Sequence, residues 1–210
     1  MKFTSKAFAA TAVAFLGSTA VMAEDLTIAY INKLDDNPWF VREVDGARAE
    51  AEKRNVAFVH QGVQNDSNRA LSALETAIAS GVDGVVVVVP DQEIGPAVMA
   101  RAAEVGIPVV AVDDGIKDAA GNPAPFVGFE AKAIGAQVGN AIADFHGSLG
   151  WGDSVADDTV VLSVEVQGLS VCMDRNNAAN AALQERLGVT DDQIVHVPYD
   201  PGNLDVALSA

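Results

Sequence analysis

The sequence predicts an α/β protein built around a doubly wound parallel sheet. β-Branched runs alternate with segments whose apolar residues recur at helical spacing, and short connections join them. The clearest strand runs from Gly84 to Pro90 and contains only valine between these two residues. An apolar run without alternation is typical of a strand that is covered on both faces. Half of the 210 residues are hydrophobic, which indicates a packed globular chain.

The first five strands and three helices are predicted from apolar periodicity, helix caps and glycine stops. Asn37 is placed to cap a helix that has Pro38 in its first turn. Gly81 and Gly106 are placed to end the second and third helices. The predicted strands are 26–31, 56–60, 84–90, 108–113 and 126–129, and the predicted helices begin near residues 38, 67 and 92.

A second α/β unit follows Glu130 but supplies only two predicted strands. Its predicted elements are a long helix from 131, a loop over 147–158, a strand over 159–164, a helix over 173–187 and a strand over 194–198. We expect Trp151, in the loop, to be packed. Two strands are too few for an independent parallel sheet with both faces covered. We therefore divide the chain into an N-terminal lobe, 24–129, and a partial second lobe, 130–210.

The N-terminus has the pattern of a secretory signal peptide, 1–23. Lys2 and Lys6 form a positive segment before a short apolar stretch, Ala7 to Leu16, and Val21-Met22-Ala23 is typical of a cleavage site. The apolar stretch is too short for a membrane-spanning helix. The single cysteine, Cys172, lies far downstream and can make no internal disulfide. We expect a soluble monomer that is exported to a bacterial periplasm.

The charge and the missing motifs exclude several functions. A formal net charge of −16 argues against a nucleic-acid partner, which needs a basic surface. The turn after the first predicted strand contains no glycine, so it lacks the loop that holds a dinucleotide, and no phosphate-binding loop occurs. His60, His146 and His196 are scattered and follow no metal-ligand spacing. We expect no cofactor, no metal and no catalytic residue.

Polar and aromatic side chains follow the predicted strands at the positions where ligands bind in such sheets. Carboxylates and amides pair with vicinal hydroxyls, and an aromatic face covers the C–H surface of a sugar ring. This mixture favours a neutral polyol over an anion. The candidates are Lys33, Asn37, Trp39, Phe40, Asp91, Asp113 and Asp114, with Asp114 the strongest.

Structural alternatives stay open for most of these candidates. Asp91 is also placed to cap a helix, Asp113 to bond its own loop, and the two aromatics to anchor a helix start. Asp113 and Asp114 are a poor acid–base pair, because neighbouring side chains at a strand end point apart.

Several short stretches of the chain match a known family, in the same order. The most specific are Asn37-Pro-Trp-Phe40 after the first strand and Ala111-Val-Asp-Asp114 after the fourth. Val89-Pro-Asp91, Ala131-Lys-Ala-Ile-Gly135 and Gln193-Ile…Val197-Pro198 extend the match over nearly the whole mature chain. With these stretches the sequence resembles the periplasmic sugar-binding proteins of ABC importers, and among them the branch that binds L-arabinose.

This resemblance implies the type I periplasmic binding protein fold, in which two doubly wound lobes close over one monosaccharide. It also implies a partner permease in the inner membrane, to which such a protein delivers an aldose such as L-arabinose. By position, it implies sugar ligands at Lys33, Trp39, Phe40, Asp113, Asp114, Phe129, Leu169 and Arg175. Asn37 stands where the family has a glutamate and Val171 where it has a threonine.

Family members continue beyond the equivalent of Ala210 to complete the second lobe. The resemblance therefore implies a truncated chain with weak or no sugar affinity. An exported enzyme is disfavoured by the missing glycine loop, and a sugar-responsive repressor by the signal peptide and the lack of a basic DNA-reading segment. A receptor for chemotaxis or sensor-kinase signalling would use the same pocket and stays open.

Overall fold

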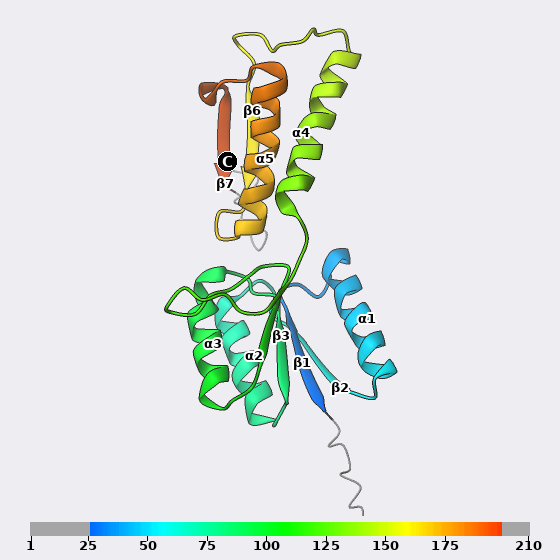
Figure 1. Cartoon of the computed structure of the whole chain (residues 1–210), viewed down its shortest axis with the longest axis vertical. Coiled ribbons are helices and arrows are strands. Elements are labelled where there is room, and N and C mark those ends of the chain that lie inside the picture. The colour runs from blue at the N-terminus through cyan, green and yellow to red at the C-terminus, as the bar shows by residue number, and fades with distance from the viewer. Residues whose placement is uncertain (1–25, 199–210) are drawn as a thin grey trace, which may run out of the picture.

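The computed structural model describes residues 26–198 and shows two α/β lobes joined near Phe129 (Figure 1). The predicted signal peptide and residues 199–210 lie outside this range. The first lobe contains one parallel sheet with the strand order β2-β1-β3-β4-β5. Its strands are β1 (Thr27–Asn32), β2 (Ala57–Gly62), β3 (Gly84–Val87), β4 (Val109–Val112) and β5 (Phe126–Val127). This order confirms the predicted doubly wound sheet.

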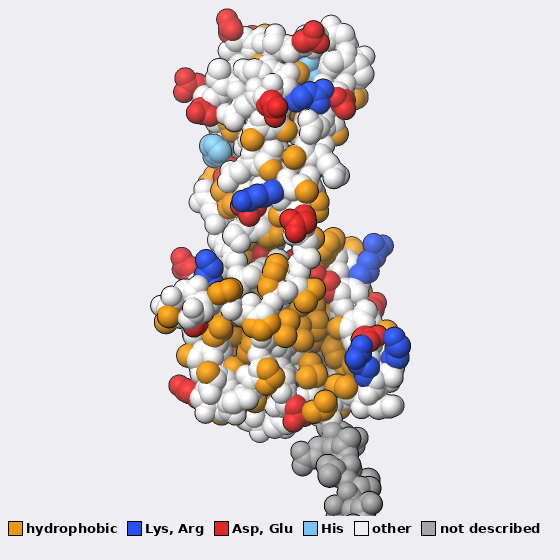
Figure 2. All heavy atoms as spheres, in the orientation of Figure 1, with side chains coloured by type: hydrophobic (Ala, Val, Ile, Leu, Met, Phe, Trp, Pro, Cys, Tyr) orange, Lys and Arg blue, Asp and Glu red, His pale blue; other side chains and the backbone are white. Residues whose placement is uncertain are grey.

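Helices cover the two faces of this sheet unequally. The helices α2 (Ser67–Ala79) and α3 (Gly95–Glu104) lie on one face and α1 (Pro38–Lys53) on the other (Figure 1). The main core lies under α2 and α3, where Val63, Leu74, Val85, Val98 and Ala111 are almost fully buried. On the face of α1, hydrophobic side chains reach the surface between this helix and the β5 edge (Figure 2).

The strand order places the functional rim. The chain goes from β1 outward to β2 and then back across to β3, so the winding reverses between β1 and β3. Ligands in open α/β sheets bind outside the carboxyl ends of the strands at such a reversal. Lys33 directly follows β1, and Asp113 and Asp114 directly follow β4. Sequence-distant polar residues therefore meet at one edge of the sheet.

The second lobe is a helix pair packed on a short sheet. The helices α4 (Ala131–Ser148) and α5 (Ser170–Leu187) lie side by side, and β6 (Val161–Glu165) pairs in parallel with β7 (Ile194–Pro198). A 3₁₀ turn, η2 (Asp191–Gln193), precedes β7. Glycines on α4 allow the helices to approach closely, since a Cβ at Gly139 would lie 2.4 Å from the carbonyl oxygen of Ala179.

Several predicted boundaries are wrong by a few residues. The third strand ends at Val87 rather than at Pro90, and β5 spans two residues rather than four. The third helix is split into a 3₁₀ turn, η1 (Gln92–Ile94), and α3, because Pro96 lacks an N–H donor and suits only the start of a helix. The helix expected from 173 begins at Ser170. Trp151 is 66% exposed, so the expectation that it is packed is wrong.

Candidate functional site

A cleft of about 420 Å³ lies between the two lobes. This volume falls in the range of small-molecule sites. The first lobe contributes mostly polar residues to its lining, and the second lobe contributes mostly apolar ones. The first lobe contributes Lys33, Leu34, Asn37, Trp39, Phe40, Asn65 and Asp113 to the lining. The chain from residue 129 onward contributes Phe129, Ile134, Val166, Leu169, Val171, Cys172 and Arg175.

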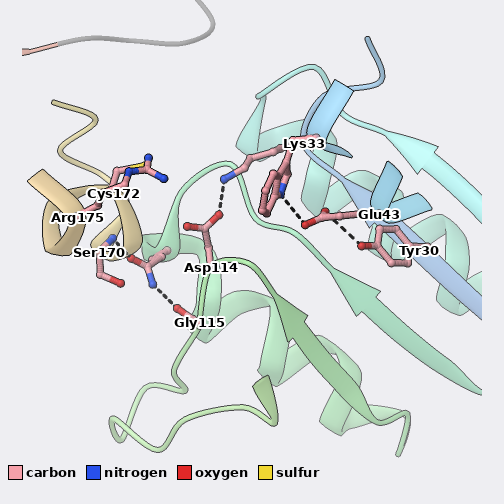
Figure 3. A network of polar contacts seen from close by, with 10 residues as sticks. Tyr30, Lys33, Glu43, Asp114, Gly115, Ser170, Cys172 and Arg175 are labelled. Carbon is pink, nitrogen blue, oxygen red and sulfur yellow. Dashed lines mark hydrogen bonds and ion pairs between the residues drawn. The ribbon is translucent and has the colours of Figure 1, made fainter. Parts of the chain in front are cut away.

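The floor of the cleft is a buried ion pair between Lys33 and Asp114 (Figure 3). Lys33 Nζ donates to Asp114 Oδ2, and both side chains are almost completely buried. The Lys33 ammonium group also lies 5.3 Å from the ring centroid of Phe40. Asp114 Oδ1 is buried and has no hydrogen-bond partner in the protein. The pair therefore leaves one carboxylate oxygen unsatisfied.

A tight turn at the end of β4 places the two carboxylates in succession. Asp113 has φ of 65°, a left-handed conformation that Asp tolerates better than most residues. The N–H of Asp114 donates to the carbonyl of Val112 at 2.7 Å, which closes a three-residue turn around Asp113. Asp113 Oδ1 is also buried without a partner. Buried polar atoms are rarely left unpaired, so Asp113 Oδ1, at the lining of the cleft, marks a position where a ligand donor fits.

Burial dominates the electrostatics of these two acids. It raises the pKa of Asp113, and the neighbouring charge of Asp114 raises it further. Burial also raises the pKa of Asp114, although Lys33 opposes that change by its charge and its hydrogen bond. Arg175, from the second lobe, lowers the pKa of both carboxyl groups to a smaller extent. Hydroxyl donors from a ligand would stabilise the ionised forms.

The start of α1 presents an indole at the rim of the cleft. Asn37 Oδ1 caps the helix by accepting from the N–H of Trp39 at 2.9 Å, as predicted. The indole Nε1 donates to Glu43 Oε1 at 2.8 Å, and its ring lies edge-on to Phe129 with centroids 5.6 Å apart. Trp39 is 52% exposed. It is therefore held in place while its surface stays accessible.

The second lobe supplies an apolar wall with one cation. The first turns of α5 contribute Val171, Cys172 and Arg175, and Leu169 precedes them in a fully packed position. Arg175 Nη2 lies 3.7 Å from Cys172 Sγ. Burial raises the pKa of the Cys172 thiol, so it is a neutral group at neutral pH. The wall therefore offers apolar contact and a single guanidinium donor.

Most of the ligand residues expected from the sequence are brought together in this cleft. Eight of them line it: Lys33, Asn37, Trp39, Phe40, Asp113, Phe129, Leu169 and Arg175. Asp114 lies beneath the lining and is connected to it through Lys33. Asp91 does not line the cleft. Its Oδ1 accepts from the N–H of Glu93 at 2.8 Å and caps η1, which is the structural alternative considered for it.

Sequence reasoning missed several lining residues. Asn65 has φ of 56° in the turn after β2, and its Oδ1 is buried without a partner. A run of turn-forming residues after β2, at the same sheet edge as Lys33, was the available signal for it. Val166, directly after β6, and Cys172, on α5, carried no such signal, because only the packing of the second lobe against the first brings them to the cleft.

Residues 26–198 contain neither a metal-binding cluster nor a membrane-spanning helix. In that range, no group of three or more His, Cys, Asp or Glu side chains is placed to hold a metal ion. No helix in the same range is both long enough and apolar enough to span a bilayer.

Sequence comparison connects this geometry to known proteins. Residues 28–209 match the family described as periplasmic binding protein domain. An ABC transporter L-arabinose-binding periplasmic protein of Azospirillum brasilense is 36% identical over 148 residues, which are 68% of this chain and 44% of that protein. The L-arabinose-binding periplasmic protein of Escherichia coli K12 is 30% identical over an alignment that covers 99% of this chain and 64% of that protein. The chain thus spans less than two thirds of the length of these relatives.

Structural comparison agrees on the fold. A solute-binding protein of an ABC transporter from Mycobacterium smegmatis, solved with glycerol bound, superposes with a TM-score of 0.67 at 24% identity. The superposition covers 83% of this chain and 56% of that one. The described residues therefore share their fold with a part of that solute-binding protein. The chain belongs to the periplasmic binding protein family.

Proposed function

We propose that this chain binds a neutral monosaccharide, an aldose such as L-arabinose, as the solute receptor of an ABC importer. The observation that carries the proposal is the unpaired Oδ1 of Asp113, at the lining of a cleft that is also lined by the half-exposed indole of Trp39. A hydroxyl group of a sugar would donate to this oxygen, and the face of Trp39 would cover the C–H surface of the ring.

The charge balance of the cleft supports a neutral ligand. Asp113 and Asp114 carry two negative charges, and Lys33 and Arg175 carry two positive ones, so no net charge is left for an ionic ligand. An anion would meet two buried carboxylates, and a cation would meet the Lys33 ammonium group and the Arg175 guanidinium. The hydroxyl groups of a neutral sugar can donate to the two carboxylates and accept from Lys33 and Arg175.

The relatives support the choice of sugar and the transport role. Two of them are named for binding L-arabinose. By analogy, we infer delivery to an inner-membrane permease, with no cofactor, no nucleic-acid partner and no chemistry on the sugar. Asn37 and Val171, which replace acidic and hydroxyl side chains of the family, would change the hydroxyl contacts.

We also propose that residues 1–23 direct export to the periplasm and that the mature chain comprises a first lobe, 24–129, and part of a second, 130–210. N-terminal sequencing of the protein recovered from a periplasmic extract tests the first point. A mature N-terminus at Glu24 is expected, and recovery of the protein with Met1 intact contradicts it.

Calorimetric titration with L-arabinose, D-xylose and D-galactose tests the binding site. Asp113→Asn replaces a carboxylate that makes no hydrogen bond through its Oδ1 with a neutral amide, so its effect on folding is small while a sugar donor loses a charged acceptor. Loss of a charge-assisted hydrogen bond predicts about tenfold or greater weakening of the affinity. Asp45→Asn, at an exposed position on α1, is the matched control.

The outcomes separate clearly. Binding of at least one of these sugars, weakened by Asp113→Asn and unchanged by Asp45→Asn, supports the proposal. Equal affinity of the Asp113→Asn variant and the unmodified chain, or heat only with a charged solute such as a sugar phosphate, contradicts it.

A further inference from the structure

The side chain of Gln92 connects the two lobes beside the cleft. Its Oε1 accepts from the backbone N–H of Ser170 at 2.6 Å, and its Nε2 donates to the carbonyl oxygen of Gly115. Gly115 directly follows Asp114, and Ser170 directly follows Leu169. Dashed lines beside Ser170 and Gly115 mark these two contacts in the close view (Figure 3). One side chain therefore joins the backbone next to the buried carboxylate to the backbone next to the apolar wall.

This contact replaces a cap that α5 lacks. The first N–H groups of a helix have no partner within the helix, and Ser, Thr, Asp or Asn at the N-cap normally accepts from one of them. The N-cap of α5 is Leu169, whose side chain offers no acceptor. Ser170 is the first residue of α5, and its N–H is satisfied by Gln92 from the other lobe. The cap exists only while the two lobes are together.

The residue before Gln92 also packs against the second lobe. A Cβ on Gly168 would lie 3.3 Å from Asp91 Oδ2, so the loop before α5 lies directly against the residue that precedes Gln92. Within the described chain, the Gln92–Ser170 bond is the one side-chain hydrogen bond that joins residues 26–127 to residues 131–198. The polar connection between the lobes therefore depends on a single residue.

We propose that Gln92 is a positioning residue that holds the first turn of α5 against the first lobe and so sets the closed form of the cleft. The inference rests on the proposed function, because it assumes that the ligand is held between the lobes. Gln92 does not line the cleft itself; it acts through α5, whose first turns carry Cys172 and Arg175. Replacing Gln92 leaves every side chain that lines the cleft unchanged but frees the first turn of α5 from its contact with the first lobe.

The first test needs no ligand. Amide hydrogen exchange at Ser170, followed by NMR, reports whether its N–H has an acceptor. Gln92→Ala should accelerate exchange at Ser170 severalfold, whereas Glu93→Ala, at an exposed neighbour in the same turn, should not. Gln92→Glu retains an acceptor oxygen and should restore protection. Unchanged exchange at Ser170 in Gln92→Ala overturns the inference, and thermal melts confirm that each variant is folded.

The second test uses L-arabinose and the fluorescence of Trp39 in stopped flow. Gln92→Ala should raise the dissociation rate constant about fivefold, the size expected for loss of one helix cap, with little change in the association rate constant. Gln92→Glu should recover part of this loss, because its carboxylate keeps an acceptor for the N–H of Ser170.

The two proposals fail in different ways. Sugar binding with an unchanged dissociation rate and unchanged Ser170 exchange in Gln92→Ala overturns the role of Gln92 and leaves the proposed function intact. No binding of L-arabinose, D-xylose or D-galactose by the unmodified chain, together with accelerated Ser170 exchange in Gln92→Ala, contradicts the proposed function and supports the interlobe contact.

Discussion

Replacing Asp114 by Asn tests the reasoning about the buried ion pair most directly. The change keeps the shape of the side chain but leaves the buried Lys33 ammonium group without its paired carboxylate. The Lys33 side chain is 7% exposed and that of Asp114 is 0% exposed, so water cannot take over as the partner. Removing one member of a buried pair typically costs about 3–5 kcal/mol.

The pKa of Asp114 helps to place the expected value within this range. Its pKa is raised, because the cost of burial exceeds the attraction of Lys33. Asp114→Asn also removes the burial cost of the carboxylate, and we expect the free energy of unfolding of the first lobe to fall by about 3 kcal/mol, the lower end of the range. With a urea slope of about 2 kcal/mol per M, the midpoint would fall by roughly 1.5 M.

The assay uses the position of the two tryptophans. Trp151, exposed in the second lobe, is replaced by Phe so that Trp39 becomes the single fluorophore and reports unfolding of the first lobe. Urea titrations then compare Asp114→Asn with the double variant Lys33→Met/Asp114→Asn, which removes both charges. We expect the double variant to be the more stable of the two, because it has no buried unpaired charge.

Two results would refute this reasoning. One is a loss of less than about 1 kcal/mol for Asp114→Asn, which would mean that Lys33 finds water or another partner. The other is a double variant that is no more stable than Asp114→Asn, which would mean that the loss comes from packing and not from charge.

Three further predictions concern the rim, the pH response and the helix pair. Trp39→Ala should weaken L-arabinose affinity about tenfold or more while Trp39→Phe retains most of it, as measured by calorimetry; equal losses would contradict a stacking role. Burial raises the pKa of Glu43 from 4.5 to about 7, so the native state keeps a proton that the unfolded chain releases, and the free energy of unfolding should fall as pH rises from 4.5 to about 7. Glu43→Gln should remove that component in urea titrations across the window, and an unchanged pH dependence would show that another group causes it. Gly139→Ala should destabilise the second lobe by about 1–3 kcal/mol in thermal melts because its Cβ meets a backbone oxygen of α5. Gly147→Ala, also on α4, meets nothing within 4 Å and should be neutral or stabilising by up to about 1 kcal/mol, so equal effects of the two would contradict the packing argument.

The alternation of strands and helices was readable from the sequence because it depends on local patterns. Val85 to Val89 is apolar on both faces, and Asn37 and Pro38 together mark the start of α1. Strand ends were less well predicted. Val88 still donates to the carbonyl of Ile31 at 2.8 Å, but the ladder with β4 has ended by then, and no local pattern shows where a neighbouring strand stops.

The roles of the rim residues also depend partly on local sequence and partly on tertiary contacts. Asp91 and Asp114 look alike in the sequence, since each follows a valine-rich strand. The structure gives them different surroundings: Asp91 caps η1, whereas Asp114 is buried against Lys33. Sequence position placed both acids at the sheet edge, and only the neighbours supplied by other segments decided which of them caps a helix and which pairs with Lys33 beneath the cleft.

The sequence by itself determined a doubly wound parallel sheet and the set of polar and aromatic residues at its carboxyl edge, because strand periodicity, caps and turns act over a few neighbouring residues. The tertiary structure alone decided how the second lobe meets that edge. The N–H of Ser170 finds its acceptor on Gln92, 78 residues earlier in the chain, because the packing of two lobes and not any local preference brings them within hydrogen-bond distance.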